Sequence, residues 1–400
     1  MAAAALSTIL GALPVFLLGA LGVLIRRDLD FSQVQFGLAV SAYFTVSALA
    51  SVPAGRAAQS LGAWYTTVLA ALLSAGALLG VAVAVTSFPG LLIALAVAGT
   101  GSALAQIGSN DALARGVPSS RQGLAFGVKQ AAVLGASLIA GLTLPLVALP
   151  LGWRPTFALA AGMALVYVLV APGPRSRPSG STRRTGGRAD VPLPVLVVIG
   201  AAAALGAGSA NAMGAFLVDY AIAEGRGASS AGLLLAGGSA LGVVVRLVVG
   251  WLADARSRGH LAVVAAMLAG GSAGMLFIAA GGPALAVGAA LAFGLGWSWP
   301  GLLNFTVVRL NPTAPAVATS IIQTGAFTGG ALGPLTFGFG VAGASYAVAW
   351  CAAGVAMLAA AVMLLVARRL LSAQGGQGAQ GASGIQGELA EAPPVRQLSD

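Results

Sequence analysis

Charged residues are scarce in this chain of 400 residues, where Asp, Glu, Lys and Arg together make up only 8%. A soluble globular domain carries roughly 25%. So few charges cannot cover a surface that faces water on all sides. The mean hydropathy of +0.94 agrees with this, and most of the surface must therefore face lipid.

Cysteine, histidine and lysine are scarcer still, with Cys351, His260 and Lys129 as the lone examples. One cysteine and one histidine cannot build a disulfide or a Cys/His metal cluster within a chain. Since no deep carboxylate pair accompanies them, we expect no metal, no cofactor and no enzyme activity. The net charge of +10 does not indicate nucleic acid, because the arginines stand between apolar runs and not in basic patches with aromatic residues.

Long apolar runs fill the rest of the chain. A helix needs about 20 apolar residues to cross a bilayer core of about 30 Å. Such runs lie near 5–25, 34–54, 64–85, 89–111, 121–146, 153–171, 192–218, 229–252, 260–280, 283–307, 315–340 and 344–367. They lack the two-residue alternation of barrel strands. The sequence therefore predicts an all-α integral membrane protein with twelve transmembrane helices.

Two polar segments interrupt these runs. Residues 172–190 are basic and rich in Pro, Gly and Ser, and they predict a cytoplasmic linker between an N-terminal six-helix half, 1–171, and a C-terminal six-helix half, 191–371. Residues 372–400 are rich in Gly, Gln and Ala and predict a disordered cytoplasmic tail.

The two halves show traces of a repeat. A shift of roughly 195 residues superposes Gly37 on Gly232 and Gly55 on Gly250, and nearly the same shift superposes Asp111 on Asn304 and Gln130 on Gln323. Two halves with the same orientation are typical of parallel repeats in transporters. The glutamine pair supports the repeat better than the glycines, which are abundant.

Arginine placement predicts the orientation. Cytoplasmic loops of membrane proteins carry an excess of Lys and Arg. With the N-terminus inside, the inner side holds Arg56, Arg115, Arg121, Arg175, Arg177, Arg183, Arg184, Arg188, Arg256, Arg258, Arg309, Arg368 and Arg369, and the outer side holds Arg26, Arg27, Arg154 and Arg226. We therefore expect a multi-pass protein of the cell (inner or plasma) membrane with both termini in the cytoplasm.

A loop motif occurs twice at matching places. Residues 250–258 read Gly-Trp-Leu-Ala-Asp-Ala-Arg-Ser-Arg and residues 55–63 read Gly-Arg-Ala-Ala-Gln-Ser-Leu-Gly-Ala. The first of these resembles the cytoplasmic signature of the major facilitator superfamily, Gly-x-x-x-Asp-(Arg/Lys)-x-Gly-(Arg/Lys). The second departs from it at Gln59 and Ala63, and the first departs at Ser257. With the repeat and the twelve runs, the resemblance implies that superfamily's fold and solute transport by alternating access.

The resemblance also implies a latch. Gly55, Gly250, Asp254, Arg256 and Arg258 would hold helix ends together in one state, because a carboxylate at a helix end pairs with nearby arginines. We expect Asp111 to act at the same side of the membrane, paired with Arg115 or Arg121. An ordinary charged turn is the plainer interpretation of this loop.

Arg246 stands four residues before Gly250. The string Arg-Leu-Val-Val-Gly resembles the helix-8 pattern of oxalate/formate exchangers and monocarboxylate transporters, in which the arginine binds a substrate carboxylate. A guanidinium suits this role because its planar fork matches a carboxylate. Proton-coupled monocarboxylate carriers have an acid where this chain has Gly242. The alternative is an arginine that extends to the headgroups.

Lys129 follows Arg121 by eight residues, which places it near the bilayer midplane of the fifth helix. A cation at that depth is costly and indicates function by default. Its neighbour Gln130 and the repeat partner Gln323 would flank a substrate from both halves. The alternative is a structural lysine that pairs with Asp111 or with a backbone carbonyl.

Further cavity candidates are polar or aromatic residues in helices that line the cavity of the superfamily: Tyr43, Asn211, Trp297 and Asn304. Asp219, near the outer end of the seventh helix, could join Asn211 and Tyr220 in an outer gate, or be a plain interfacial residue. Trp297 lies just before Pro300, which indicates a hinge or a cavity wall.

These features predict a monomeric secondary transporter for a small organic anion, with a coupling ion or counter-substrate, in a lipid bilayer. A drug or neutral-solute exporter of the same superfamily is the alternative within transport. A membrane receptor is the alternative outside it, although the tail resembles no signalling domain.

Overall fold

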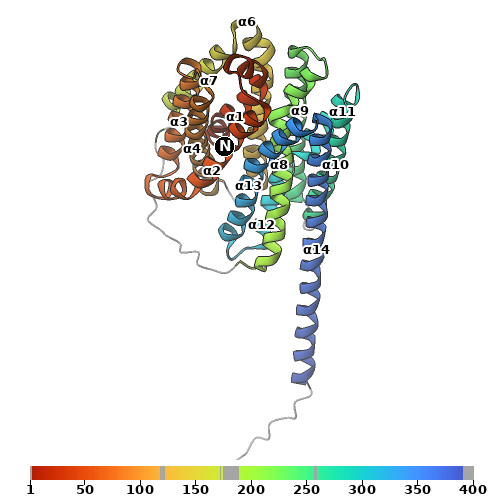
Figure 1. Ribbon diagram of the computed structural model, residues 1–400. Coiled ribbons are helices and arrows are strands. Elements are labelled where there is room, and N and C mark those ends of the chain that lie inside the picture. Colours follow the sequence, from red (N-terminus) through yellow and green to blue (C-terminus); the bar gives the residue numbers. More distant parts are fainter. Residues whose placement is uncertain (1, 118–121, 172, 174–188, 256–258, 391–400) are drawn as a thin grey trace, which may run out of the picture.

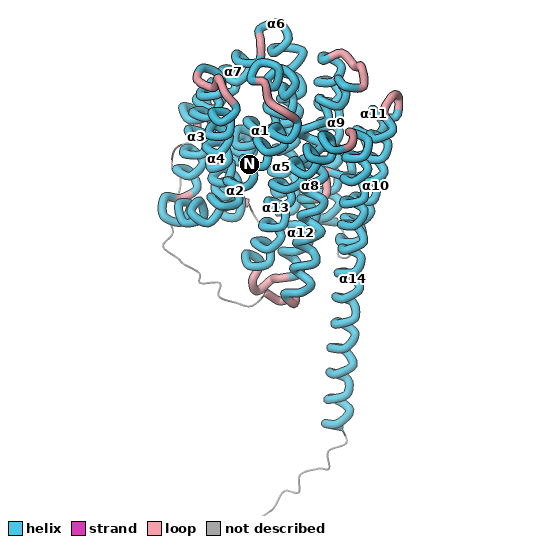
Figure 2. Tube along the Cα trace, viewed as in Figure 1, coloured by secondary structure: helices cyan, strands magenta, loops and turns pink. Residues whose placement is uncertain are grey.

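The computed structural model describes residues 2–117, 122–171, 173, 189–255 and 259–390 (Figure 1). All regular secondary structure in these ranges is helical (Figure 2). The all-α prediction is therefore confirmed. Eleven of the described helical segments are long and apolar enough to cross a membrane. The twelfth expected span corresponds to α13, which has sufficient length but is rich in glycine and threonine.

Helices of the first half form the red to yellow lobe of Figure 1. They are α1 (Ala2–Leu29), α2 (Gln33–Leu61), α3 (Ala63–Val83), α4 (Phe88–Gly116), α5 (Gln122–Thr143), a π-helical turn η2 (Leu144–Ala148), α6 (Leu149–Leu151) and α7 (Trp153–Val170). The segment from α5 to α6 forms one membrane span, which Pro145 interrupts because proline lacks the N–H of a regular helix.

Helices of the second half form the green to blue lobe. They are α8 (Leu193–Ala223), α9 (Ala228–Ala255), α10 (His260–Ala280), α11 (Ala284–Leu291), a π-helical turn η3 (Ala292–Gly296), α12 (Pro300–Leu310), α13 (Pro315–Gly343) and α14 (Tyr346–Ala390). The run from α11 to α12 is one span. It is broken where Trp297 and Ser298 precede Pro300, so the expected single helix 283–307 is a broken one.

Packing within the halves shows the repeat. The first span packs on the fifth and the third on the sixth in the N-terminal half, as α1 with α5 and α3 with α7. The same pairs recur in the C-terminal half as α8 with α13 and α10 with α14. Two copies of one six-helix arrangement in the same chain direction account for this. The predicted parallel repeat is therefore present.

The two halves meet along two helix pairs, α5 with α9 and α2 with α13, and α1 also packs on α8. Glycines allow these helices to approach closely, as expected for membrane helices. A Cβ at Gly19 would lie 2.6 Å from the Gly214 carbonyl oxygen, and one at Gly141 would lie 2.8 Å from the Gly232 carbonyl oxygen. Ser239 of α9 donates a buried hydrogen bond to Ser137 of α5, 2.9 Å away.

The C-terminal segment extends the last helix. Residues 372–400 were predicted to be disordered, but α14 continues as a helix to Ala390 (Figure 1). An existing helix is extended at one hydrogen bond per added residue without a new nucleation step. Alanine and glutamine favour that extension, whereas the glycines among them disfavour it. The described part therefore shows a helix as far as Ala390, residues 391–400 lie outside the described ranges, and disorder of the tail stays a prediction.

Candidate functional site

Lys129 is buried in the middle of α5, with 5% of its surface exposed. Its ammonium donates to the Asn110 side-chain oxygen at 2.7 Å and lies 3.4 Å from the Gln106 carbonyl oxygen. Both acceptors belong to α4 and are neutral. Among the described residues, no carboxylate pairs with Lys129. Within the described part of the chain, the lysine is therefore a membrane-buried cation held by neutral acceptors.

Arg246 of α9 is buried as well, with 4% of its surface exposed. Its Nε donates to the Trp297 carbonyl oxygen at 3.1 Å and its Nη2 donates to the same oxygen. Its Nη1 donates to the Gln130 carbonyl oxygen of α5, in the other half. The side chain therefore points inward and does not extend to the headgroups, and it joins the two halves of the protein.

A small cavity adjoins Arg246. It is lined by Gln130, Gly250, Ser298 and Gly301, among others, and has a volume of about 10 Å³. That is room for about one water molecule. The bonds to described residues leave one further N–H on each terminal nitrogen of the guanidinium. The site has donors to offer, but in this conformation it has no room for a carboxylate.

The remaining cavity candidates are dispersed. Gln323 is exposed on α13, and the Gln130 side chain, on α5, is half-buried beside Arg246. Asn211 donates within its own helix to the Ala207 carbonyl oxygen at 2.8 Å. Asn304 is half-buried on α12.

Two aromatic candidates pack between helices. Tyr43 is buried and its hydroxyl donates to the Gly11 carbonyl oxygen at 2.7 Å, which ties α2 to α1. Trp297 packs edge-on against Phe16 of the first half, with ring centroids 5.5 Å apart. Trp297 therefore contacts both Arg246 and the opposite half. The break before Pro300 places the Trp297 carbonyl where Arg246 can reach it.

The cytoplasmic loop signature is described only in part. Gly55 and Gly250 lie in the last turns of α2 and α9, and Gly250 lines the cavity beside Arg246. Gly62 has φ of 86°, which favours glycine at this position of the signature. The second loop has its corresponding left-handed residue at Gly259, with φ of 89°. The side chains of Asp111 and Asp254, and residues Arg256 and Arg258, lie outside the described part.

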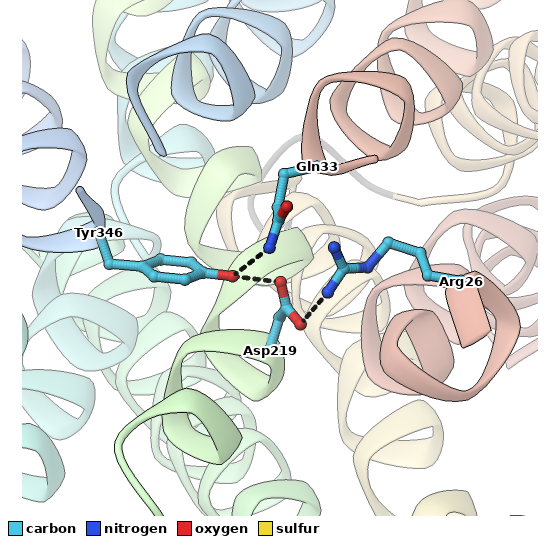
Figure 3. A network of polar contacts seen from close by, with 4 residues as sticks. All are labelled: Arg26, Gln33, Asp219 and Tyr346. Atoms are coloured by element: carbon cyan, nitrogen blue, oxygen red, sulfur yellow. Dashed lines mark hydrogen bonds and ion pairs between the residues drawn. The ribbon is translucent and has the colours of Figure 1, made fainter. Parts of the chain in front are cut away.

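A polar cluster that sequence reasoning located only through Asp219 lies at the opposite end of the bundle (Figure 3). Arg26 of α1 pairs with the Asp219 carboxylate of α8 at 2.5 Å. Tyr346 of α14 donates its hydroxyl to the other carboxylate oxygen, and Gln33 of α2 donates to Tyr346 at 3.5 Å. The expected partners differ, since Asn211 bonds within its own helix. Arg26, Gln33 and Tyr346 carried no sequence signal that linked them to Asp219.

Comparisons with known proteins agree with this architecture. The sequence matches the Major Facilitator Superfamily over residues 2–334. No curated protein sequence matches the chain. Among solved structures, the chain is similar to the proton:xylose symporter XylE bound to 6-bromo-6-deoxy-D-glucose, with a TM-score of 0.70, 16% identity, and coverage of 91% of this chain and 94% of that one.

Two further structures are similar. A bacterial homologue of the human lysosomal transporter Spinster, in an inward-facing and occupied conformation, gives a TM-score of 0.66 at 16% identity, over 92% of this chain and 94% of that one. The E. coli fucose:proton symporter FucP gives 0.62 at 17% identity, over 92% of this chain and 98% of that one. The match over most of the sequence, the repeated six-helix halves and the shared fold lead to one conclusion: the chain belongs to the major facilitator superfamily of membrane transporters.

Proposed function

We propose that this transporter moves a small organic anion, of the carboxylate class, across the cell membrane by alternating access. The observation that carries the proposal is a pair of buried cations, Lys129 and Arg246, whose partners among the described residues are all neutral oxygens. Such charges at membrane depth almost always face the bundle interior or a water-filled cavity, and usually pair. An anionic solute supplies the missing charge.

The two cations belong to different halves, and Arg246 bonds to the residue that follows Lys129 on α5. Lys129 is itself on α5 and points to α4, whereas Arg246 extends from α9 to the Gln130 carbonyl oxygen, one residue further along. An anion bound between them would therefore contact both halves. Substrate binding and the relative position of the halves would be coupled through that bridge.

The space beside Arg246 is narrow, so anion binding requires the surrounding helices to move. A cavity of about 10 Å³ must widen before a carboxylate can reach the two remaining N–H groups. Gln130 and Trp297 supply the carbonyls that hold Arg246, so α5 or the break before α12 has to move. We therefore place the anion-bound state in a different conformation from this one.

Calorimetric titration of purified protein with a panel of carboxylates tests the substrate class. Lys129→Ala should weaken binding because it removes the positive charge. Arg246→Lys should weaken it because an ammonium cannot reproduce the guanidinium fork. Loss of one charged hydrogen bond costs about 1.5–3 kcal/mol, or roughly tenfold to over a hundredfold in affinity.

The matched control is Arg369→Lys, the same substitution at an exposed position near the end of the membrane part of α14. It should bind like the wild type. Wild-type affinity in both cavity variants, with unchanged melting temperature, would contradict the anion proposal. Preference of the wild type for sugars or cationic drugs would support the neutral-solute or drug exporter instead.

The cytoplasmic loop is proposed to act on the cycle and not on the substrate. Asp254→Asn should slow transport more than it weakens binding, because a carboxylate in the cytoplasmic loop is expected to shift the equilibrium between states and not to contact a substrate at the midplane. Transport rates in proteoliposomes, compared with calorimetric affinity, separate the two effects. A variant that cycles normally but binds weakly would refute this role.

A further inference from the structure

The Arg26–Asp219 ion pair joins the two halves at the end of the bundle remote from the linker. Arg26 lies in the last turn of α1 and Asp219 near the end of α8. Both side chains are largely buried, with exposed fractions of 15% and 7%. The other ion pair among the described residues, Arg154 with Asp28, lies within the N-terminal half and is more exposed, at 34% and 50%.

Four helices meet at the Asp219 carboxylate, two from each half (Figure 3). One oxygen accepts from Arg26 of α1 and the other accepts from Tyr346 of α14. Gln33, at the start of α2, donates to the Tyr346 hydroxyl. The carboxylate therefore joins α1 to α8 and α14, and Gln33 links α2 to the cluster through Tyr346.

An aromatic layer lies one helical turn deeper. Phe36 of α2 contacts Phe216 of α8 edge-on across the halves, with ring centroids 5.0 Å apart. Phe216 contacts Phe337 of α13 at 4.8 Å, and Phe337 contacts Trp350 of α14 at 4.6 Å. These side chains are buried, and Phe36, Phe216 and Trp350 are at most 1% exposed. The polar cluster therefore rests on a buried aromatic layer.

We propose that these two layers form the gate that closes the outer side of the transporter. The ionic layer is Arg26, Asp219, Tyr346 and Gln33, and the aromatic layer is Phe36, Phe216, Phe337 and Trp350. The inference rests on the alternating access of the proposed function but not on the nature of the substrate. Opening this side requires Arg26 and Asp219 to separate, because they belong to different halves.

The ion pair stabilises the closed gate. Removal of one partner leaves the other as a buried, uncompensated charge, which is costly. A closed gate without its ion pair is therefore destabilised relative to an open one, in which water reaches both groups. Substitution of either residue should favour the open state, whereas exchange of the two charges should restore the closed one.

Spin labels across this end measure the opening directly. Thr86, between α3 and α4, and Ala344, between α13 and α14, are exposed and lie in loops of different halves at the same end. Both are changed to cysteine in a Cys351→Ser background, since Cys351 is the one native thiol and is exposed. Distances are measured by double electron–electron resonance in nanodiscs, without any substrate, so failure of the anion proposal does not affect the outcome.

Asp219→Asn and Arg26→Gln should each raise the ratio of long to short distances at least tenfold, which equals about 1.4 kcal/mol at 25 °C. Tyr346→Phe removes only the hydroxyl and should give a smaller shift in the same direction. The exchange Arg26→Asp with Asp219→Arg should return the distribution toward the wild type. Asp28→Asn breaks the ion pair within one half and should leave the distribution unchanged.

Wild-type distributions in Asp219→Asn and Tyr346→Phe would overturn the gate, and so would an equal shift in Asp28→Asn. If a charge variant fails to fold, Phe36→Ala provides an independent test through the aromatic layer. It should also populate the longer distances, and an unchanged distribution there would overturn the proposal.

Discussion

Removing the hydrogen bond between Lys129 and Asn110 tests whether the buried lysine is charged. Asn110→Ala removes the 2.7 Å acceptor and leaves the ammonium with the Gln106 carbonyl oxygen at 3.4 Å. Hydrogen bonds to charged groups contribute about 1.5–3 kcal/mol. Asn110 is itself exposed, so we expect a loss at the lower end, about 1.5 kcal/mol.

A double-mutant cycle with Lys129→Met separates the charge from the packing. Methionine is of similar length and carries no charge to satisfy, so the substitution alone should be close to neutral. Without the ammonium, Asn110→Ala should then cost almost nothing. The expected coupling energy is about 1.5 kcal/mol, within the range for residues in contact.

Unfolding by SDS in mixed micelles, followed by tryptophan fluorescence, measures these differences, and the chain has 6 tryptophans to report it. Asn211→Ala is the control, because Asn211 bonds only to the Ala207 carbonyl oxygen of its own helix. It should show no coupling to Lys129→Met. Additive costs for Asn110→Ala and Lys129→Met would refute the reasoning, since Lys129 would then not depend on Asn110 for its charge.

Three other predictions concern packing, acid stability and topology. Gly329→Ala should destabilise the protein by about 1–3 kcal/mol in the same assay, because its Cβ would lie 1.9 Å from a backbone oxygen of α8, whereas Gly76→Ala, with nothing within 4 Å, should be neutral or stabilising. Hydrogen bonds from the side chain and backbone of Thr313 hold the pKa of Asp190 below its ordinary 3.8. The stabilisation by these hydrogen bonds is therefore present above pH 3.8 and is lost as the pH falls through the lowered pKa. Asp190→Asn should therefore reduce the fall in melting temperature between pH 6 and pH 3. In a Cys351→Ser background, Ser179→Cys in the linker should resist an impermeant thiol reagent added to intact cells, and ready labelling would contradict the predicted topology.

Hydropathy alone determined the membrane architecture. Apolar runs of bilayer length leave the chain no alternative to helices, since backbone groups in lipid must bond internally. The repeat followed from spacing. Pro300 indicated a hinge in the expected helix 283–307, but the break itself was not predicted, and its reason is the missing proline N–H. The continuation of α14 to Ala390 was missed because composition reports disorder without regard to an adjacent helix.

Some side chains of the candidate site could be singled out from the sequence, because charged residues are rare at membrane depth. Lys129 was singled out because a cation at membrane depth is rare, and Arg246 because its surrounding residues resemble a family pattern, but the bonding partners of both were not predicted. Acceptors such as the Gln130 and Trp297 carbonyls belong to the backbone, which every residue has, so no sequence pattern marks them. The same holds for Arg26 and Asp219, which are 193 positions apart. Only the docking of two six-helix halves brings such groups together, because that contact is a property of whole helix faces and not of any local run of residues.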